Sequence, residues 1–322
     1  MNLSSVFIFL FILSAISTMA LAQEAMGNNG DPGKQKNRII FKDTSNIPQD
    51  SRTDSSTQSR DYYLFIPYYQ NENLSLGASA KNQRVHLNQV PTHSNFTPVE
   101  NLHSIQYGLS YSGYDSEKNV WNFNASYGSA SDQPFKDSTV SAIDATLSKK
   151  VQESEEHSWM YFLNYSNNRT FLSGIPLPGI AYTYTATDKR NGWMIGIPFW
   201  LYWARPDDHW TYSTFIFLPS NITAQVGYFV WGPLQTSLKF QWNQQSYFRY
   251  GRTDNDEQIY FEKKRISTGL KLFLGKASFL ELELAKSFDQ SLFNGKNMFN
   301  KTSDTLDLSD ELQSYLNLQY EF

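Results

Sequence analysis

The stretch Tyr-Leu-Asn-Leu-Gln-Tyr-Glu-Phe at residues 315–322 decides the fold. Successive side chains of an extended chain point to opposite sides. One side of this segment then carries only apolar or aromatic groups, those of Leu316, Leu318, Tyr320 and Phe322. The other side carries Tyr315, Asn317, Gln319 and Glu321. One lipid-compatible face and one polar face are typical of a strand in a transmembrane β-barrel. The alternative is the edge strand of a soluble β-sandwich.

The same period of two recurs through most of the chain, and no convincing period of 3.6 residues appears after the N-terminal apolar run. It predicts an all-β fold, a transmembrane antiparallel barrel over residues 61–322. We expect about 14 strands, at 61–70, 102–113, 119–128, 138–150, 157–165, 179–187, 192–198, 199–205, 209–218, 222–231, 234–245, 259–274, 277–288 and 312–322. The strands on either side of Pro198 are short for an apolar band of about 25 Å. If they fail as separate strands, the number falls to 12.

The lengths of the connections predict the orientation of the barrel. Counting back from Phe322, the connections are a long segment at 289–311, a tight turn at Gly275-Lys276, a loop at 246–258 and a tight turn at Gly232-Pro233. Outer-membrane barrels have short turns on the periplasmic side and longer loops on the outside. The C-terminus is therefore expected at the periplasmic end.

The first sixty residues differ from the rest. An apolar run from Val6 to Ile16, followed by Ala20-Leu21-Ala22, predicts a signal peptide over residues 1–22. Residues 23–60 are polar and are expected to form a disordered periplasmic leader. The short apolar island at Ile39, Ile40 and Phe41 leaves a second possibility, a partial plug inside the lumen.

Composition excludes several classes of protein. The chain has no cysteine, so a lipid anchor on cysteine, a disulfide framework and a thiolate metal site are all excluded. The net charge is −4 and there is no basic tract, so nucleic acid is not an expected partner. Aromatic residues make up 16% of a chain whose mean hydropathy is only −0.50. That combination suits a barrel, since only half of each strand faces lipid.

Tryptophans follow charged turns at four places and open the next strand. These residues are Trp121, Trp159, Trp193 and Trp210. Indole rings gather at membrane interfaces, so the pattern predicts an aromatic girdle at the inner interface. Ordinary hairpins with buried tryptophans are the alternative.

Several motifs resemble a known family. The stretches Gly174–Tyr182, Gly196–Phe199 and Arg205–Asp208 are similar to blocks of a bacterial outer-membrane β-barrel family of unknown function, and so are Gln245–Arg249 after Trp242, and Tyr260–Arg265. The similarity covers roughly residues 100–322 and offers no catalytic residues. It implies location in the outer membrane of a Gram-negative bacterium, in contact with lipid and lipopolysaccharide.

The terminal strand also resembles the signal that the barrel-assembly machinery of Gram-negative bacteria recognises. On that resemblance, Tyr320 and Phe322 form the assembly signal and the machinery is a partner during biogenesis. The oligomeric state stays open.

The sequence offers no self-consistent catalytic set. His103-Ser104 and His157-Ser158 are adjacent pairs, so the two side chains of each pair point to opposite faces of a strand. The acidic run Asp254–Glu257 departs from a calcium-loop pattern. We therefore expect no enzyme activity, no cofactor and no metal site.

Charged residues of both signs share the polar face of the C-terminal strands and are the candidate lumen-lining residues: Lys239, Arg265, Lys271, Glu281, Glu283 and Glu321. Two interpretations follow. The charges can line a narrow porin-like channel for small solutes. Alternatively they neutralise one another in a non-conducting structural or adhesin-like, surface-binding barrel. A hydrolase in the barrel wall is the least favoured alternative.

Overall fold

The structure is a computed structural model that describes residues 35–47, 56–88, 99–187, 191–198, 200–217, 221–275, 277–299 and 301–322. The predicted signal peptide lies outside these residues. The described part is almost entirely β-strand, and its one helical element is the short 3-10 turn Ser138–Val140. None of the described helices is long and apolar enough to cross a membrane.

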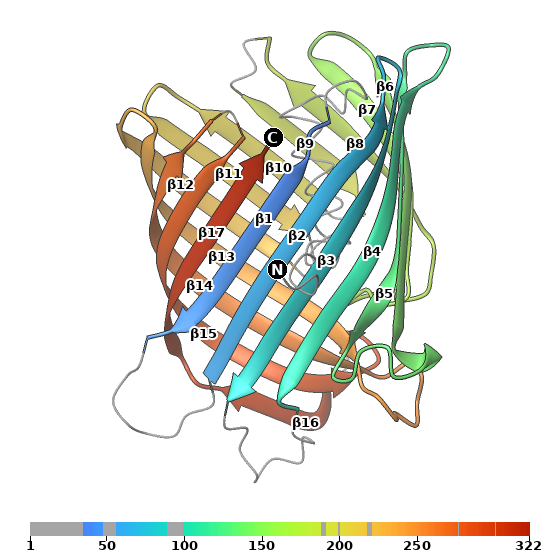
Figure 1. The fold of residues 1–322 in the computed structure, drawn as a ribbon, viewed down its shortest axis with the longest axis vertical. Helices are drawn as coiled ribbons and strands as arrows, with labels where there is room; N and C mark the ends of the chain where they lie inside the picture. The colour runs from blue at the N-terminus through green and yellow to red at the C-terminus, as the bar shows by residue number, and fades with distance from the viewer. Residues whose placement is uncertain are drawn as a thin grey trace.

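The described strands form one antiparallel sheet that closes on itself. In chain order they are β1 (Arg38–Asn46), β2 (Ser56–Gln70), β3 (Leu74–Asn88), β4 (Asn101–Tyr114), β5 (Val120–Ser131), β6 (Ser141–Gln152), β7 (His157–Ser166), β8 (Leu177–Thr185), β9 (Gly192–Ile197), β10 (Trp200–Pro206), β11 (Trp210–Phe217), β12 (Asn221–Trp231), β13 (Leu234–Phe248), β14 (Gln258–Phe273), β15 (Phe279–Gly295), β16 (Lys301–Leu308) and β17 (Glu311–Glu321). Sixteen strands form the ring, and β16 pairs only with β15, outside it. The ring closes where β1 pairs with β17, side by side in Figure 1.

The predicted antiparallel barrel is confirmed, and the predicted number of strands is wrong. Each of the fourteen expected strands is present, and the two strands of the ring that the prediction missed are β1 and β3. The outer half of β3 explains its omission, because there the polar residues Asn82 and Arg84 take the outward face while Val85 and Leu87 point inward and are buried. This reversal removes the regular two-faced pattern that identifies a strand.

The leader prediction for residues 23–60 is wrong where the structure describes them. Residues 38–46 form β1, which pairs with β17 along its whole length and with β2 from Arg38 to Thr44, and β2 already begins at Ser56. The apolar island is therefore part of the wall and not a plug. Ile39 is exposed on the outside, whereas its neighbour Ile40 is buried on the inside.

The outer surface carries the lipid-facing residues. Large apolar side chains are exposed on strands all around the ring, among them Leu109, Leu163, Ile195, Leu238, Leu270, Leu282 and Leu284. A soluble protein rarely exposes so much contiguous apolar surface. A closed antiparallel barrel with an apolar exterior is the architecture of the Gram-negative outer membrane. The chain is an outer-membrane β-barrel.

The wall is uneven in height. Strands β13, β14 and β15 have 15, 16 and 17 residues, whereas β9, β10 and β11 have 6, 7 and 8. The long strands continue beyond the predicted ends, and the segment predicted as a loop at 289–311 contains the end of β15 and all of β16. Their outer ends cross the barrel, so that Phe248 at the end of β13 pairs with Ser131 of β5. In Figure 1 this outer end lies at the bottom of the view, where β16 is also found.

Candidate lumen site

The lumen contains a cavity of about 320 Å³. Its lining comes from β1, β2 and β3 on one side and from β12 to β15 and β17 on the other. Side chains alternate in direction along each strand, so every second residue of these strands faces inward. Much of the polar lining comes from the odd-numbered residues of β13, β14 and β17, among them Lys239, Gln241, Asn243, Lys263, Arg265, Tyr315 and Asn317.

Five cationic side chains and three anionic ones line the cavity. They are Lys42, Lys239, Lys263, Arg265 and Lys271 against Asp61, Glu281 and Glu283. Five of the six predicted lumen residues are therefore brought together in this cavity. The sixth, Glu321, lies at the periplasmic end of the wall, where its Oε1 atom is 2.7 Å from the Nη2 atom of Arg38.

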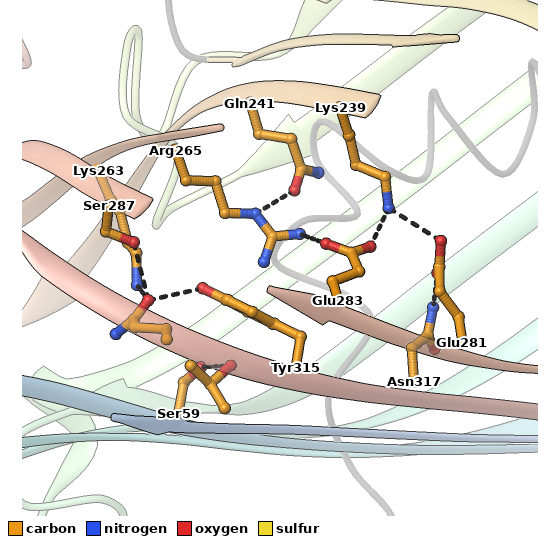
Figure 2. A network of polar contacts seen from close by, with 12 residues as sticks. Ser59, Lys239, Gln241, Lys263, Arg265, Glu281, Glu283, Ser287, Tyr315 and Asn317 are labelled. Atoms are coloured by element: carbon orange, nitrogen blue, oxygen red, sulfur yellow. Dashed lines mark hydrogen bonds and ion pairs between the residues drawn. The ribbon is translucent and has the colours of Figure 1, made fainter. Parts of the chain in front are cut away.

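Glu283 is the centre of an ion-pair network in the lumen, shown in Figure 2. Lys239 donates to the carboxylates of Glu281, at 3.3 Å, and of Glu283. Arg265 approaches Glu283 from the other side, with 3.3 Å between its Nη2 atom and Oε2. Asn317 donates to the second oxygen of Glu281 at 2.9 Å. All four charged side chains, those of Lys239, Arg265, Glu281 and Glu283, are largely buried, so each needs the others to offset its loss of hydration.

Tyr315 continues the network towards the outer end. The guanidinium of Arg265 lies over its ring, 3.8 Å from the centroid, and the ammonium of Lys263 is 5.8 Å from the same centroid. Gln313 connects β17 to β14, because its Oε1 atom accepts from Lys263 at 2.6 Å and from the Tyr315 hydroxyl at 3.0 Å. The Arg265 Nε atom donates to Gln241 at 2.5 Å. These contacts fix the orientation of the Arg265 side chain.

The sequence analysis did not identify four residues that line the cavity: Lys42, Asp61, Lys263 and Tyr315. Lys42 and Asp61 face each other across β1 and β2, and β1 was expected to be outside the barrel. Lys263 could have been found, because it stands two residues before Arg265 and therefore on the same face of β14.

Above the cavity the inward surface becomes apolar. Inward-facing residues from the outer ends of β3, β4, β5 and β6 pack against residues of β13 to β16 in one buried cluster, named here the outer seal: Val85, Leu87, Val99, Leu102, Ala130, Val140, Ala142, Tyr247, Phe248, Ile259, Phe261, Leu292, Leu306 and Leu308. Phe261 and Val85 belong both to this cluster and to the lining of the cavity. The outer seal therefore forms the roof of the cavity.

The four predicted interface tryptophans all lie at periplasmic strand ends. Trp159 and Trp193 flank Tyr182, with ring centroids 4.7 and 5.7 Å away, and Trp210 lies 4.8 Å from Tyr228. Trp121 donates to Asp115 in the preceding turn, at 3.2 Å. Desolvation opposes ionisation of Asp115, but hydrogen bonds from Asn119, Lys149 and Trp121 outweigh it and hold the pKa of this carboxyl well below its usual range.

The two residues of the predicted assembly signal lie together on the outside of β17. Tyr320 and Phe322 are both exposed, and their rings stack with centroids 5.7 Å apart. The backbone N–H of Phe322 donates to the carbonyl of Asn37, next to β1. The predicted assembly signal therefore lies where β17 pairs with β1 and closes the ring. Its recognition by the assembly machinery stays a prediction.

The imidazole rings of the described histidines form no hydrogen bond with a serine side chain in the part of the chain that the structure describes. His157 bonds to the Tyr182 hydroxyl at 2.8 Å, and His86 bonds to Asn101 at 2.9 Å. Ser158 and Ser104 are buried on the inner face, opposite their neighbouring histidines. His93 lies outside the described residues. Across the described ranges, no three histidine, aspartate or glutamate side chains gather as a metal site.

Comparison with known structures finds outer-membrane proteins at low similarity. The chain is similar to an outer-membrane channel from Pseudomonas putida F1 (8% identity, 91% of this chain and 98% of that one, TM-score 0.35) and to OpdK of Pseudomonas aeruginosa, solved with vanillate (10%, 89% and 98%, TM-score 0.36). It is also similar to the porin NanC (9%, 89% and 100%, TM-score 0.32). Similarity at this level assigns no function. Comparison with family models and with curated proteins finds no match.

Proposed function

We propose that this barrel is a narrow channel for small polar solutes, and that the described conformation is its closed state. The observation that carries the proposal is the charged cavity in the middle of a ring of sixteen strands. A ring of this size encloses more space than its own side chains fill, as in the sixteen-stranded porins. The polar residues of the lumen would provide the hydrogen bonds that a solute loses when it leaves water.

The outer seal determines how such a channel would open. Its residues come from two groups of strands, β3 to β6 and β13 to β16, and the two groups meet across the lumen. The ends of β13, β14 and β15 extend past the ring, and β15 pairs there only with β14 and β16. Separation of the two groups would open the roof of the cavity without breaking the sixteen-stranded ring.

A non-conducting structural or surface-binding barrel is the second candidate, and the outer seal favours it. A buried apolar cluster across the mouth excludes water and ions as long as it persists. The two functions differ in whether the seal separates. We propose no enzyme activity for this barrel.

The test is the conductance of the reconstituted mature chain in planar bilayers. Phe261 is 6% exposed and joins the seal to the cavity, so Phe261→Ala should weaken the roof. Phe240→Ala is the matched control, because Phe240 sits on the outward face of β13 beside Leu238. A channel predicts small, brief conductance steps in the unaltered chain and the control, and longer openings in Phe261→Ala. No conductance in any of the three would support the non-conducting barrel.

A further inference from the structure

We propose that the lumen cavity binds small solutes that carry a carboxylate, with Lys263 and Arg265 as the binding groups beneath the outer seal and Lys271 near the periplasmic end. This inference rests on the proposed channel function, because it names the class of solute that the channel takes.

The charge balance of the cavity is positive. Two of the three carboxylates of the lining, those of Glu281 and Glu283, are paired with Lys239, and the third, Asp61, stands opposite Lys42 on the neighbouring strand. Lys263 and Lys271 form no ion pair within 4.0 Å among the described residues. A cationic solute would have to compete with Lys239 for its carboxylates. An anionic solute finds two ammonium groups that are outside direct ion pairs, although Glu281 stands opposite Lys271 on the neighbouring strand.

The guanidinium of Arg265 has hydrogen-bonding capacity left over. Its Nε atom donates to Gln241, and its Nη2 atom approaches Glu283. The Nη1 atom is buried and bonds to no acceptor in the described part of the chain. A buried donor of this kind gains most from an acceptor that carries charge. The contacts with Gln241, Glu283 and the Tyr315 ring hold the group in place, so an incoming carboxylate would not need to reorganise it.

Lys263 supplies the second binding group at the same level. Residues two apart on a strand lie on one face, roughly 7 Å apart at the Cα atoms. An ammonium has three donors, and Lys263 gives one of them to Gln313 at 2.6 Å. A carboxylate placed beside the Tyr315 ring can therefore accept from Lys263 with one oxygen and from Arg265 with the other.

Lys271 extends the basic surface towards the periplasm. It stands eight residues from Lys263 on the same face of β14, a distance of about 26 Å along the strand. Its ammonium lies 3.6 Å from the centroid of the Phe279 ring. Lys239, on β13, faces Ser267 of β14 between the two levels. The inner face of these strands thus presents cations from the periplasmic end to the roof of the cavity.

The experiment is isothermal titration of the mature chain in detergent with succinate, and with succinamide, which has the same skeleton without charge. We expect succinate to bind and succinamide to bind at least tenfold more weakly. Lys263→Gln should weaken succinate binding roughly tenfold, because it removes one charge-assisted hydrogen bond. Lys286→Gln is the control, since Lys286 is exposed on the outer face and pairs with Asp310. Equal binding of the two compounds, or unchanged succinate binding in Lys263→Gln, would overturn the inference.

A bilayer measurement separates this inference from the channel proposal. Under a gradient of potassium chloride, the unaltered chain should prefer chloride, and Lys263→Glu with Lys271→Glu should shift the reversal potential towards potassium. Succinate binding without any conductance would support the site and contradict the channel. Conductance with neither succinate binding nor chloride preference would leave the channel standing and refute the carboxylate site.

Discussion

The inner surface of the barrel differs sharply between its middle and its outer end, although the same strands build both. On β14, Arg265 and Lys263 face the charged cavity, and Phe261 and Ile259, on the same face, belong to the buried outer seal. The inward face of β14 changes from charged to apolar between two successive inward-facing residues, Lys263 and Phe261. Solute binding and closure can therefore be assigned to different heights of one wall.

The comparison shows how polar and apolar interiors are stabilised. In the middle, each buried charge needs its partners, since removing one leaves the others without compensation. At the outer end, stability comes from the area removed from water. Substitutions at the two levels should therefore act differently: the loss of a charge leaves its partner unpaired, whereas the loss of an apolar group leaves a cavity.

Glu283→Gln should have the largest effect on stability. The change leaves Lys239 and Arg265 buried without their shared carboxylate, and breaking a buried ion pair costs about 3–5 kcal/mol. The measurement is urea unfolding in lipid vesicles. Glu72→Gln, in the exposed turn between β2 and β3, is the control and should leave the unfolding free energy unchanged. Equal values for the two variants would mean that the network contributes nothing to folding.

Leu292→Ala tests the outer seal. Leu292 is 0% exposed, and a buried Leu→Ala change costs about 2–5 kcal/mol. Because the seal also closes the cavity, the variant should conduct more than the unaltered chain. Leu284→Ala makes the same change on the lipid face and should cost less and leave conductance unaltered. If Leu292→Ala loses stability but conducts no better, the seal is structural only.

Leu282→Arg tests the outward face at the level of the cavity. Leu282 is 54% exposed on the outer surface, and Arg near the bilayer midplane costs about 2–4 kcal/mol. The unfolding free energy in vesicles gives the value. In detergent micelles, where water reaches the side chain, the loss should be smaller, and an equal loss in both media would place Leu282 away from lipid.

The smallest effect is expected from the exposed ion pair that joins two outer loops. The Nζ atom of Lys296 is 2.6 Å from Asp254, and its hydrogen bond lowers the pKa of this carboxyl. Because the pKa is lower in the folded chain, the pair stabilises the loops above the ordinary value of 3.8 and loses this effect as pH falls below it. The melting temperatures of the unaltered chain and of Asp254→Asn should differ slightly at pH 7 and coincide at low pH. A difference that does not shrink as pH falls below 3.8 would exclude this origin.

Much of the architecture could be predicted from the sequence, because the lipid face imposes a period of two wherever one side of a strand is apolar. Strands such as β15, with Leu280, Leu282 and Leu284 outside, follow that rule. It fails on β1, where Ile39, Ile40 and Phe41 are consecutive, and on β3, where the apolar residues change sides. The outer seal could not be predicted from the sequence either. Phe248 and Ser131 are 117 positions apart, and no local pattern indicates that they pair.

The candidate lumen residues could be predicted for the same reason, the alternation of side chains along a strand. Lys239, Arg265, Lys271, Glu281 and Glu283 could be assigned to the lumen from alternation alone. Their arrangement could not be, because it depends on the register between β13, β14 and β15, which sets Lys239 near both glutamates. Because β1 was not predicted as a strand, its lumen residue Lys42 was not predicted either.

A reversible lock across the outer seal tests the central claim most directly. The chain has no cysteine, so Ser131→Cys with Phe248→Cys introduces only one possible disulfide, between residues that face each other on β5 and β13. The reduced form also lacks the Phe248 ring and should conduct. Oxidation should abolish conductance in planar bilayers, and a reductant should restore it. Equal conductance in the oxidised and reduced states would contradict the account that the outer seal closes the lumen.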